Sequence, residues 1–463
     1  MFKILLCAFL VSLTYGDDTC SVPTYLQQEI KQYQGLANKI VDAVINGDYK
    51  GYYYNDLELF IDTYGSRLTG TKNLEKSIDY IANKSTIQGL RVRMDPVLVP
   101  QWIRGDEQGF MVSPRMHKLK ILGLGPTPGT ETTGLMADVV VVSSFDELNS
   151  KASEVPGKIV LFNYEFTDYE STVQYRVKGP AAASKLGAVG ALVRSVTPFS
   201  IGSPHTGGTE FGDEDKPIPA AAVTLEDADL LSRLYLSGQK VTVYLKMHAH
   251  QGTDQRSRNV VVDYLGETLP NQYMTVSGHI DSWDIGQGAL DDGVGAFLAL
   301  HTVYLLNTLS LKPKRTIRAI LWTGEEFGFV GAKSYLNDHK GEFENWTAAL
   351  EADAGSYNPL GLNFAGSQDA YCIMVEIAKL FTQLNSTTVM KTSSAGSDIS
   401  VFKSQNVPLM EPMYAETPYY WFHHSDGDSM RTLNSDIMDK NLAFVAGVSY
   451  ILADLSVQLP NGK

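Results

Sequence analysis

The chain has 463 residues, of which 44% are hydrophobic and 19% charged, a composition typical of a globular protein with two or three domains. Its 38 basic and 52 acidic residues give a formal net charge of −14. Because nucleic acids and anionic membranes bind basic surfaces, this balance argues against both as main partners.

The first sixteen residues have the pattern of an export signal. A lysine at position 3 precedes an apolar run over residues 4–13, and small residues follow up to Gly16. This order is typical of a secretory signal peptide over residues 1–16. About ten apolar residues are too few to cross a bilayer, so we expect no membrane anchor. Secretion, or delivery to the lysosome by the same route, is the predicted localisation.

Two further features are compatible with the secretory route. Outside the signal the chain keeps only Cys20 and Cys372, which could form a disulfide or remain two free thiols. Three N-x-S/T triplets make Asn83, Asn345 and Asn385 candidate glycosylation sites.

The amino-terminal quarter of the chain is predicted to be mainly helical. Apolar residues at intervals of three and four predict helix over residues 22–47, and two more helices around a glycine-containing loop are predicted over residues 55–85. Residues 91–105 have the pattern of a strand. Residues 17–40 are a candidate pro-segment that would be trimmed during maturation.

From residue 115 to residue 250 the pattern changes to short β-branched runs separated by helix-like pieces. Its carboxylates are scattered and show no ligand cluster, and His205 lies in a loop rich in Gly, Ser and Thr. We therefore expect residues 115–250 to form a small inserted domain that acts as a lid or an interaction module.

From residue 251 onward, apolar runs alternate regularly with amphipathic helices. This alternation predicts an α/β fold with a mixed, mostly parallel sheet and helices on both faces. The larger domain is expected to comprise residues 41–114 and 251–463. In such folds functional groups lie at the carboxyl ends of the strands.

Acidic residues and histidines follow the predicted strands of this larger domain. They are His279 and Asp281, Asp291, Glu325 and Glu326, Asp353, and the pair His423 and His424. Each motif alone has an ordinary structural explanation, such as helix capping by Asp-Asp. Their common position at strand ends favours a shared site instead.

A shared site of this composition indicates divalent metal. Carboxylates packed together without a cation repel one another, and some would have to take up protons. A set of His, Asp and Glu without thiolate suits zinc in a catalytic site, with cobalt or manganese as the other candidates. A carboxylate shared by two ions would hold them about 3.5–4 Å apart, as in dinuclear hydrolases.

Several motifs resemble the dinuclear zinc aminopeptidase and carboxypeptidase family. They are "SGHIDSWDIGQGALDDGVGAF", "PKRTIRAILWTGEE" and "YWFHHSDGD". The resemblance covers nearly the whole chain after the signal, and the inserted segment is similar to a protease-associated domain. It implies two Zn²⁺ per chain and a peptidase activity.

The resemblance also implies a ligand set. One zinc would take His279, Asp291 and Asp353, and the other would take Asp291, Glu326 and His424, so that Asp291 bridges the two ions. Spacing alone does not choose between the two adjacent histidines, but the family pattern places the ligand directly before Ser or Thr.

Catalytic roles follow from the same resemblance. Glu325 would be the general base that takes a proton from a water shared by the two zincs and passes it to the departing amine. Asp281, two residues after His279, would accept a hydrogen bond that orients this imidazole.

Four further residues are candidates for substrate contact. Ser397 and Asp398 lie in a stretch that resembles a substrate-side loop of the family, where Asp398 would meet a free α-amino group. Tyr420 and His423 could line the pocket, although core packing is the ordinary role of such aromatics.

These observations predict a secreted or lysosomal dinuclear zinc metallopeptidase acting on dipeptides or small peptides with a free amino terminus. One alternative is a related glutaminyl cyclase, which uses a single zinc. Another is a catalytically silent ectodomain that binds partners. A homodimer is plausible from the resemblance alone.

Overall fold

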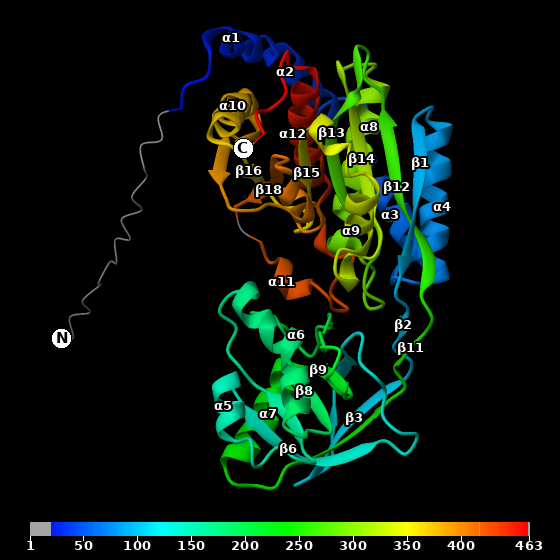
Figure 1. Ribbon diagram of the computed structural model, residues 1–463, viewed down its shortest axis with the longest axis vertical. Coiled ribbons are helices and arrows are strands. Elements are labelled where there is room, and N and C mark those ends of the chain that lie inside the picture. Colours follow the sequence, from blue (N-terminus) through cyan, green and yellow to red (C-terminus); the bar gives the residue numbers. More distant parts are fainter. Residues whose placement is uncertain (1–19, 416, 462–463) are drawn as a thin grey trace, which may run out of the picture.

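The computed structural model describes residues 20–415 and 417–461. The predicted signal, residues 1–16, lies outside the described residues. Figure 1 shows a larger part built on one sheet and a smaller part built on a second sheet, with α11 (Tyr419–Phe422) at the boundary between them.

The larger sheet has eight strands in the order β1-β12-β14-β13-β15-β18-β16-β17. Their bounds are β1 (Arg91–Val99), β12 (Gln255–Tyr264), β13 (Leu269–His279), β14 (Arg315–Trp322), β15 (Trp346–Glu351), β16 (Pro359–Ala365), β17 (Thr388–Lys391) and β18 (Leu409–Tyr414). The central strands β14, β13, β15 and β18 run parallel, whereas β1 and β12 are antiparallel additions at one side. At the other side, β16 runs antiparallel to β18. The predicted mixed sheet is confirmed.

Helices cover both faces of this sheet. They are α1 (Thr24–Gln32), α2 (Gln34–Ile45), α3 (Tyr52–Tyr64), α4 (Lys72–Ile87), α8 (Val294–Thr308), α9 (Val330–Asp338), α10 (Gln368–Ala378) and α12 (Ser435–Asp454). Because side chains alternate along a strand, Ile317, Ala319 and Leu321 of β14 enter the core formed with α8 and α12. Ile320 and Trp322 point to the opposite face, where they pack with α9.

Within the described residues, one helical stretch, Ala289–Thr308, is long and apolar enough to cross a membrane. This stretch is buried inside the protein, where α8 contacts β13, β14 and α12. A helix that is apolar on every side is expected at such a position, so the core accounts for its composition.

The predicted helix over residues 22–47 is two helices, α1 and α2, which meet at Tyr33. Leu26 and Ile30 of α1 are buried in the main core. A disulfide joins Cys20 to Cys372 of α10, which resolves the alternative that the sequence leaves open. Trimming of residues 17–40 stays a prediction.

The smaller sheet has the order β4-β3-β10-β6-β7-β8-β9-β5. Its strands are β3 (Glu107–Ser113), β4 (His117–Leu119), β5 (Ile121–Gly123), β6 (Leu135–Val142), β7 (Ile159–Phe162), β8 (Gly190–Arg194), β9 (Ala220–Val223) and β10 (Thr242–Met247). The helices α5 (Phe145–Ser150) and α6 (Tyr169–Lys185) pack on one face, and α7 (Leu225–Leu236) packs on the other.

The chain passes twice between the two sheets, and the two passages pair with each other. They form a short antiparallel ribbon of β2 (Trp102–Ile103) and β11 (His250–Gln251), visible in Figure 1 between the two parts. The strand β3 precedes the expected start of the inserted domain at residue 115 and pairs within the smaller sheet. The domain limits at 115 and 250 stay a prediction.

Candidate metal centre

Three neighbouring parallel strands bring most of the predicted site residues to one edge of the larger sheet. β13 ends at His279, β14 ends three residues before Glu325, and β15 ends two residues before Asp353. Because parallel strands end at the same edge, these side chains converge there, as predicted for an open α/β sheet.

Asp291 reaches this edge on the turn Ala289–Gly293 that leads into α8. The buried carboxylate of Asp428 holds the turn: its Oδ1 accepts the N–H groups of Ala289 at 2.8 Å and Leu290 at 2.7 Å. Its Oδ2 accepts the N–H of Asp291 at 3.2 Å. Asp428 therefore fixes the backbone that presents Asp291.

Glycines allow α8 to approach the strand end closely. A Cβ on Gly278 would lie 2.5 Å from the backbone N of Ala296, and one on Gly295 would lie 1.8 Å from the carbonyl oxygen of Ala352. The neighbouring carboxylate of Asp292 accepts the backbone N–H groups of His279 and Gly295, at 3.0 and 2.9 Å.

Asp291 lies between two groups of candidate ligands. On one side, His279 Nε2 is 3.2 Å from Asp291 Oδ1 and 3.3 Å from Asp353 Oδ1. On the other side, His424 Nε2 is 3.2 Å from Asp291 Oδ2 and 3.1 Å from Glu326 Oε2. The other four residues that the family resemblance implies as ligands are thus brought together around Asp291.

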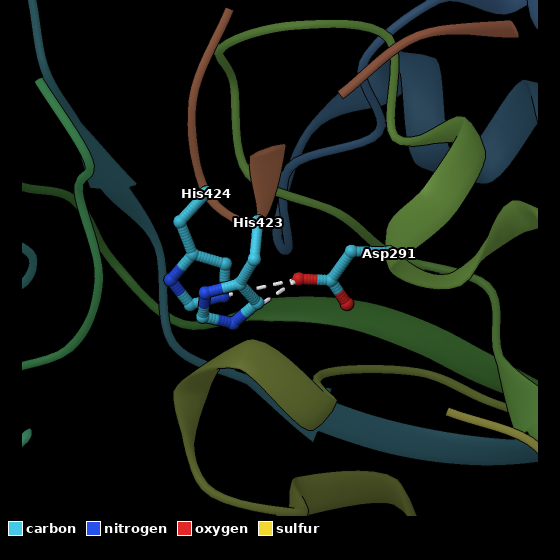
Figure 2. Close-up of side chains that lie close together, drawn as sticks. All are labelled: Asp291, His423 and His424. Carbon is cyan, nitrogen blue, oxygen red and sulfur yellow. Dashed lines mark ion pairs between the residues drawn. The ribbon is translucent and has the colours of Figure 1, made fainter. Parts of the chain in front are cut away.

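His423 also faces Asp291. Figure 2 shows both imidazoles turned toward the Asp291 carboxylate, and His423 Nε2 lies 3.5 Å from Asp291 Oδ2. The two rings stack with centroids 3.5 Å apart. Of the two histidines, His424 makes the shorter contact with Asp291 and is the one that contacts Glu326 among the described ion pairs. The choice of His424 as the ligand stays a prediction.

Charge is concentrated in this buried cluster. Burial acts to raise the pKa of Asp291, but the two imidazoles of His279 and His424 outweigh it and hold the pKa well below its usual value. Burial, together with Asp353 and Glu326, raises the pKa of Glu325 well above its usual value. The carboxylates therefore rely on neighbouring positive charge to remain ionised.

The donor set fits divalent metal. Asp291 Oδ2, Glu326 Oε1 and Asp353 Oδ1 are buried and have no hydrogen-bond partner among the described residues. Buried polar atoms are almost always satisfied, so such atoms in one cluster indicate a missing partner. Three groups lie close enough together to hold an ion: Asp291 with His423 and His424, His279 with Asp292 and Asp353, and His279 with Asp291 and Glu326. Imidazoles and carboxylates without thiolate are a set that zinc accepts.

Asp281 acts differently from the sequence-based expectation. His279 Nδ1 donates to the main-chain oxygen of Asp281 at 3.0 Å, whereas the nearest carboxylate oxygen of Asp281 is 3.7 Å away. The carboxylate instead accepts the hydroxyl of Thr69 at 2.6 Å and the backbone N–H of Glu325 at 3.1 Å. The main-chain oxygen of Asp281 thus orients the His279 imidazole. The Asp281 carboxylate orients the segment that carries Glu325 and Glu326.

A cavity of about 1200 Å³ opens between the two parts of the molecule beside this cluster. Ser397, Tyr420 and His423 are among its lining residues, as are Glu325 and Glu326. Tyr420 is stacked on Tyr169 of the inserted segment, with ring centroids 4.4 Å apart. Three of the four candidate substrate residues therefore border one space.

Asp398 differs from these three. Its side chain is fully buried, and neither carboxylate oxygen has a hydrogen-bond partner among the described residues. It is absent from the described residues that line the cavity. Burial and the nearby Glu351 raise the pKa of Asp398 well above its usual value, so its position disfavours contact with a substrate ammonium group.

The inserted segment contributes site residues that the sequence analysis does not single out. Tyr169 and Arg176 of α6 line the cavity, and Arg176 Nη1 lies 3.5 Å from His424 Nδ1. The loop residues His205 and Thr206 bond to the adjacent histidine pair. The only sequence signal for these contacts is a histidine in a loop rich in Gly and Ser.

The three candidate glycosylation sites lie at the surface to different degrees. Asn83 and Asn385 are exposed, and Asn345 is half-buried. Ser85, the acceptor-motif serine that follows Asn83, is fully buried and bonded to Tyr304. Glycosylation stays a prediction.

An α/β sheet with a His, Asp and Glu cluster at its carboxyl edge is the arrangement of a metal-dependent hydrolase. Comparison with known proteins makes the class more specific. Residues 259–449 match peptidase family M28, and residues 135–231 match the PA domain.

Relatives resemble the chain over nearly its full length. Carboxypeptidase Q of Mus musculus is 43% identical over 439 residues, covering 94% of this chain and 93% of that protein. Carboxypeptidase Q of Homo sapiens is 42% identical over 473 residues, covering 99% of each. The chain therefore belongs to peptidase family M28 and is a peptidase by class, which confirms the resemblance seen in the motifs.

Solved structures agree on the fold. A peptidase M28 precursor from Shewanella amazonensis is 27% identical, with a TM-score of 0.90 over 94% of this chain and 99% of that chain. A zinc aminopeptidase from Bacillus subtilis is 20% identical, with a TM-score of 0.64 over 89% of this chain and 97% of that chain. At that identity the second likeness concerns the fold alone.

Proposed function

We propose that this peptidase is a dinuclear zinc exopeptidase that hydrolyses dipeptides or small peptides with a free amino terminus. The observation that carries the proposal is the position of Asp291, whose two oxygens face two separate ligand groups. His279 and Asp353 complete one group, and Glu326 and His424 complete the other. Zinc ions bound there would polarise the scissile carbonyl and lower the pKa of an attacking water.

Glu325 is the proposed general base. Its side chain borders the cavity, and its Oε2 lies 3.9 Å from His279 Nε2. The carboxylate would take a proton from the attacking water and give it to the amine that leaves when the peptide bond breaks. The Asp281 carboxylate accepts the backbone N–H of Glu325 at 3.1 Å and so holds the main chain at this residue.

The shape and charge of the cavity support a short substrate. The inserted segment closes one side of the space with Tyr169 and Arg176. Arg176 is only 5% exposed and makes no ion pair with a carboxylate among the described residues. Because buried charges are normally paired, Arg176 is suited to bind a carboxylate of a small peptide.

The remaining parts of the proposal concern the cellular setting and the domains. Residues 1–16 would direct the chain to secretion or to the lysosome, and residues 115–250 would form the inserted domain. The pairing of Cys20 with Cys372 supports an oxidising compartment, because disulfides persist there.

Metal content and dipeptide hydrolysis, measured on the wild type and on Glu325→Gln, test this function. We expect two zinc ions in both proteins and an activity reduced about 10²–10⁴-fold in the variant, the range for loss of a general base. Glu344→Gln, at an exposed glutamate, is the matched control and should keep full activity.

Other results would favour the alternatives. A wild type that binds one ion would contradict the bridging role of Asp291 and favour the glutaminyl cyclase-like enzyme. A wild type that binds two ions and cleaves no peptide from a broad dipeptide panel would favour the catalytically silent binding protein.

A further inference from the structure

The inserted segment holds the backbone of the histidine pair directly. Thr206 lies in the loop between β8 and β9, and its backbone N–H donates to the carbonyl oxygen of His424 at 2.9 Å. In return, His424 Nδ1 donates to the carbonyl oxygen of Thr206 at 3.1 Å. His205 Nδ1 donates to the carbonyl oxygen of His423 at 2.7 Å.

His424 needs such support because of its backbone conformation. Its φ is +60°, in the left-handed region that residues other than glycine rarely adopt. The three hydrogen bonds from residues 205 and 206 hold both carbonyls of the pair and the outer nitrogen of the His424 ring. The local strain is thus balanced by contacts from a different part of the chain.

The loop that makes these bonds is itself firmly held. The backbone N–H of His205 donates to Ser195 Oγ at 2.9 Å, and Thr206 Oγ1 donates to the carbonyl oxygen of Gly123 at 2.7 Å. Arg176 Nη1 donates to the carbonyl oxygen of Thr206 at 3.1 Å. A Cβ on Gly207, whose φ is +146°, would lie 2.2 Å from Arg176 Cζ, so the loop packs tightly on this guanidinium.

Thr206 also determines which ring nitrogen of His424 is free. An imidazole binds metal through the nitrogen that carries no proton, and the hydrogen bond made by the other nitrogen sets the tautomer. The carbonyl oxygen of Thr206 can only accept, so it keeps a proton on His424 Nδ1. The Nε2 lone pair is then directed at Asp291 and Glu326.

We propose that His205 and Thr206 are positioning residues for His424. They would hold it for the second metal ion, the one proposed to bind Asp291, Glu326 and His424, so that the inserted segment is a structural part of the metal centre. The proposal rests on the dinuclear site proposed above. It differs from the expectation of a lid, because a lid could move away without changing metal affinity. Here, displacement of residues 205 and 206 would release His424.

The test compares His205→Leu with His205→Asn. Leucine removes the donor to the His423 carbonyl, whereas the asparagine amide can place an N–H near the position of His205 Nδ1. We expect His205→Leu to lower the affinity for the zinc ion at His424 by about 10- to 100-fold, as measured by competition with a chelator. This is the range for loss of a partner that orients a ligand. His205→Asn should restore most of this affinity.

Spectroscopy separates positioning from general stability. In the Co²⁺-loaded protein, the visible absorption of the second ion should change in His205→Leu and recover in His205→Asn. His117→Leu is the matched control, because His117 also lies in the smaller sheet but bonds to Asp227, away from the histidine pair. Should His205→Leu not fold, Ser195→Ala loosens the same loop by removing the acceptor of the His205 N–H, and a smaller loss of affinity is expected.

The outcomes are distinguishable. Two ions with wild-type affinities and spectra in both His205→Leu and Ser195→Ala would overturn the proposal and leave the dinuclear function intact. A wild type that binds a single ion would overturn the dinuclear function and the positioning role with it. Selective loss of the second ion, rescued by asparagine, would support both.

Discussion

Replacement of Asp428 tests how the protein presents its central carboxylate. In Asp428→Ala, the backbone N–H groups of Ala289, Leu290 and Asp291 lose their acceptor while remaining buried. No other side chain accepts from these three groups among the described hydrogen bonds. The turn that carries Asp291 should therefore lose its fixed conformation.

The expected magnitude follows from the number of donors. Each buried donor left without a partner costs about 1–3 kcal/mol. Three such donors at the low end give about 3 kcal/mol, because water can enter a space vacated by a carboxylate. For a domain of this size, that loss corresponds to a fall of about 5 °C in the midpoint of thermal unfolding.

Two assays check this prediction. Calorimetry of the metal-free protein measures the midpoint, and chelator competition measures zinc affinity, which should fall about 10- to 100-fold because Asp291 is displaced. Asp426→Ala is the matched control, since Asp426 is exposed in the same loop. An Asp428→Ala protein with a wild-type midpoint and wild-type zinc affinity would refute the role assigned to Asp428.

Three further predictions concern other parts of the molecule. Burial and then Asp436 raise the pKa of Asp439 to about 6, so the folded state binds this proton more tightly than the unfolded state, and stability falls as the pH rises from about 4 to 6. Asp439→Asn should therefore raise the free energy of unfolding at pH 8 and leave it unchanged near pH 3, as denaturant titrations at both pH values would show. Arg176→Met should lower kcat/KM for both a dipeptide and its carboxyl-terminal amide, because Arg176 also holds the Thr206 loop, but the loss should be about 10- to 100-fold greater for the dipeptide. An equal loss for both substrates would contradict carboxylate binding. Cys372→Ser should destabilise the protein by about 2–4 kcal/mol and expose α1 to limited proteolysis, whereas unchanged resistance would show that core packing alone secures this helix.

The sequence was sufficient for the fold class and for the convergence of the candidate metal ligands. His279 is the last residue of one strand of the parallel centre, and Glu326 and Asp353 follow two others. Parallel strands end at one edge whatever the details of packing. Periodicity was less informative at the amino terminus, where the helical pattern runs without interruption across Tyr33 although the structure has two helices there.

The parts that could not be predicted depend on the main chain and on distant segments. A carboxylate two residues from His279 suggests a side-chain contact, but in the folded protein the main-chain oxygen of Asp281 takes that bond. The contact of Thr206 with His424 joins residues far apart in the sequence through backbone atoms. Backbone hydrogen bonds are open to any residue type, so no residue pattern marks them.

The disulfide at the amino terminus has a consequence for maturation. Figure 1 shows α1 and α2 at the end of the larger part that lies away from the inserted segment, far from the cavity beside α11. A protease that cut the chain after α2 would leave the severed helices attached through Cys20 and Cys372 and packed against the core by Leu26 and Ile30. Such a cut would produce a protein of two disulfide-linked chains rather than a shorter single chain. Because α1 and α2 lie far from the cavity, the cut would not change access to it. Gels run with and without reductant would then give different sizes for the same mature molecule.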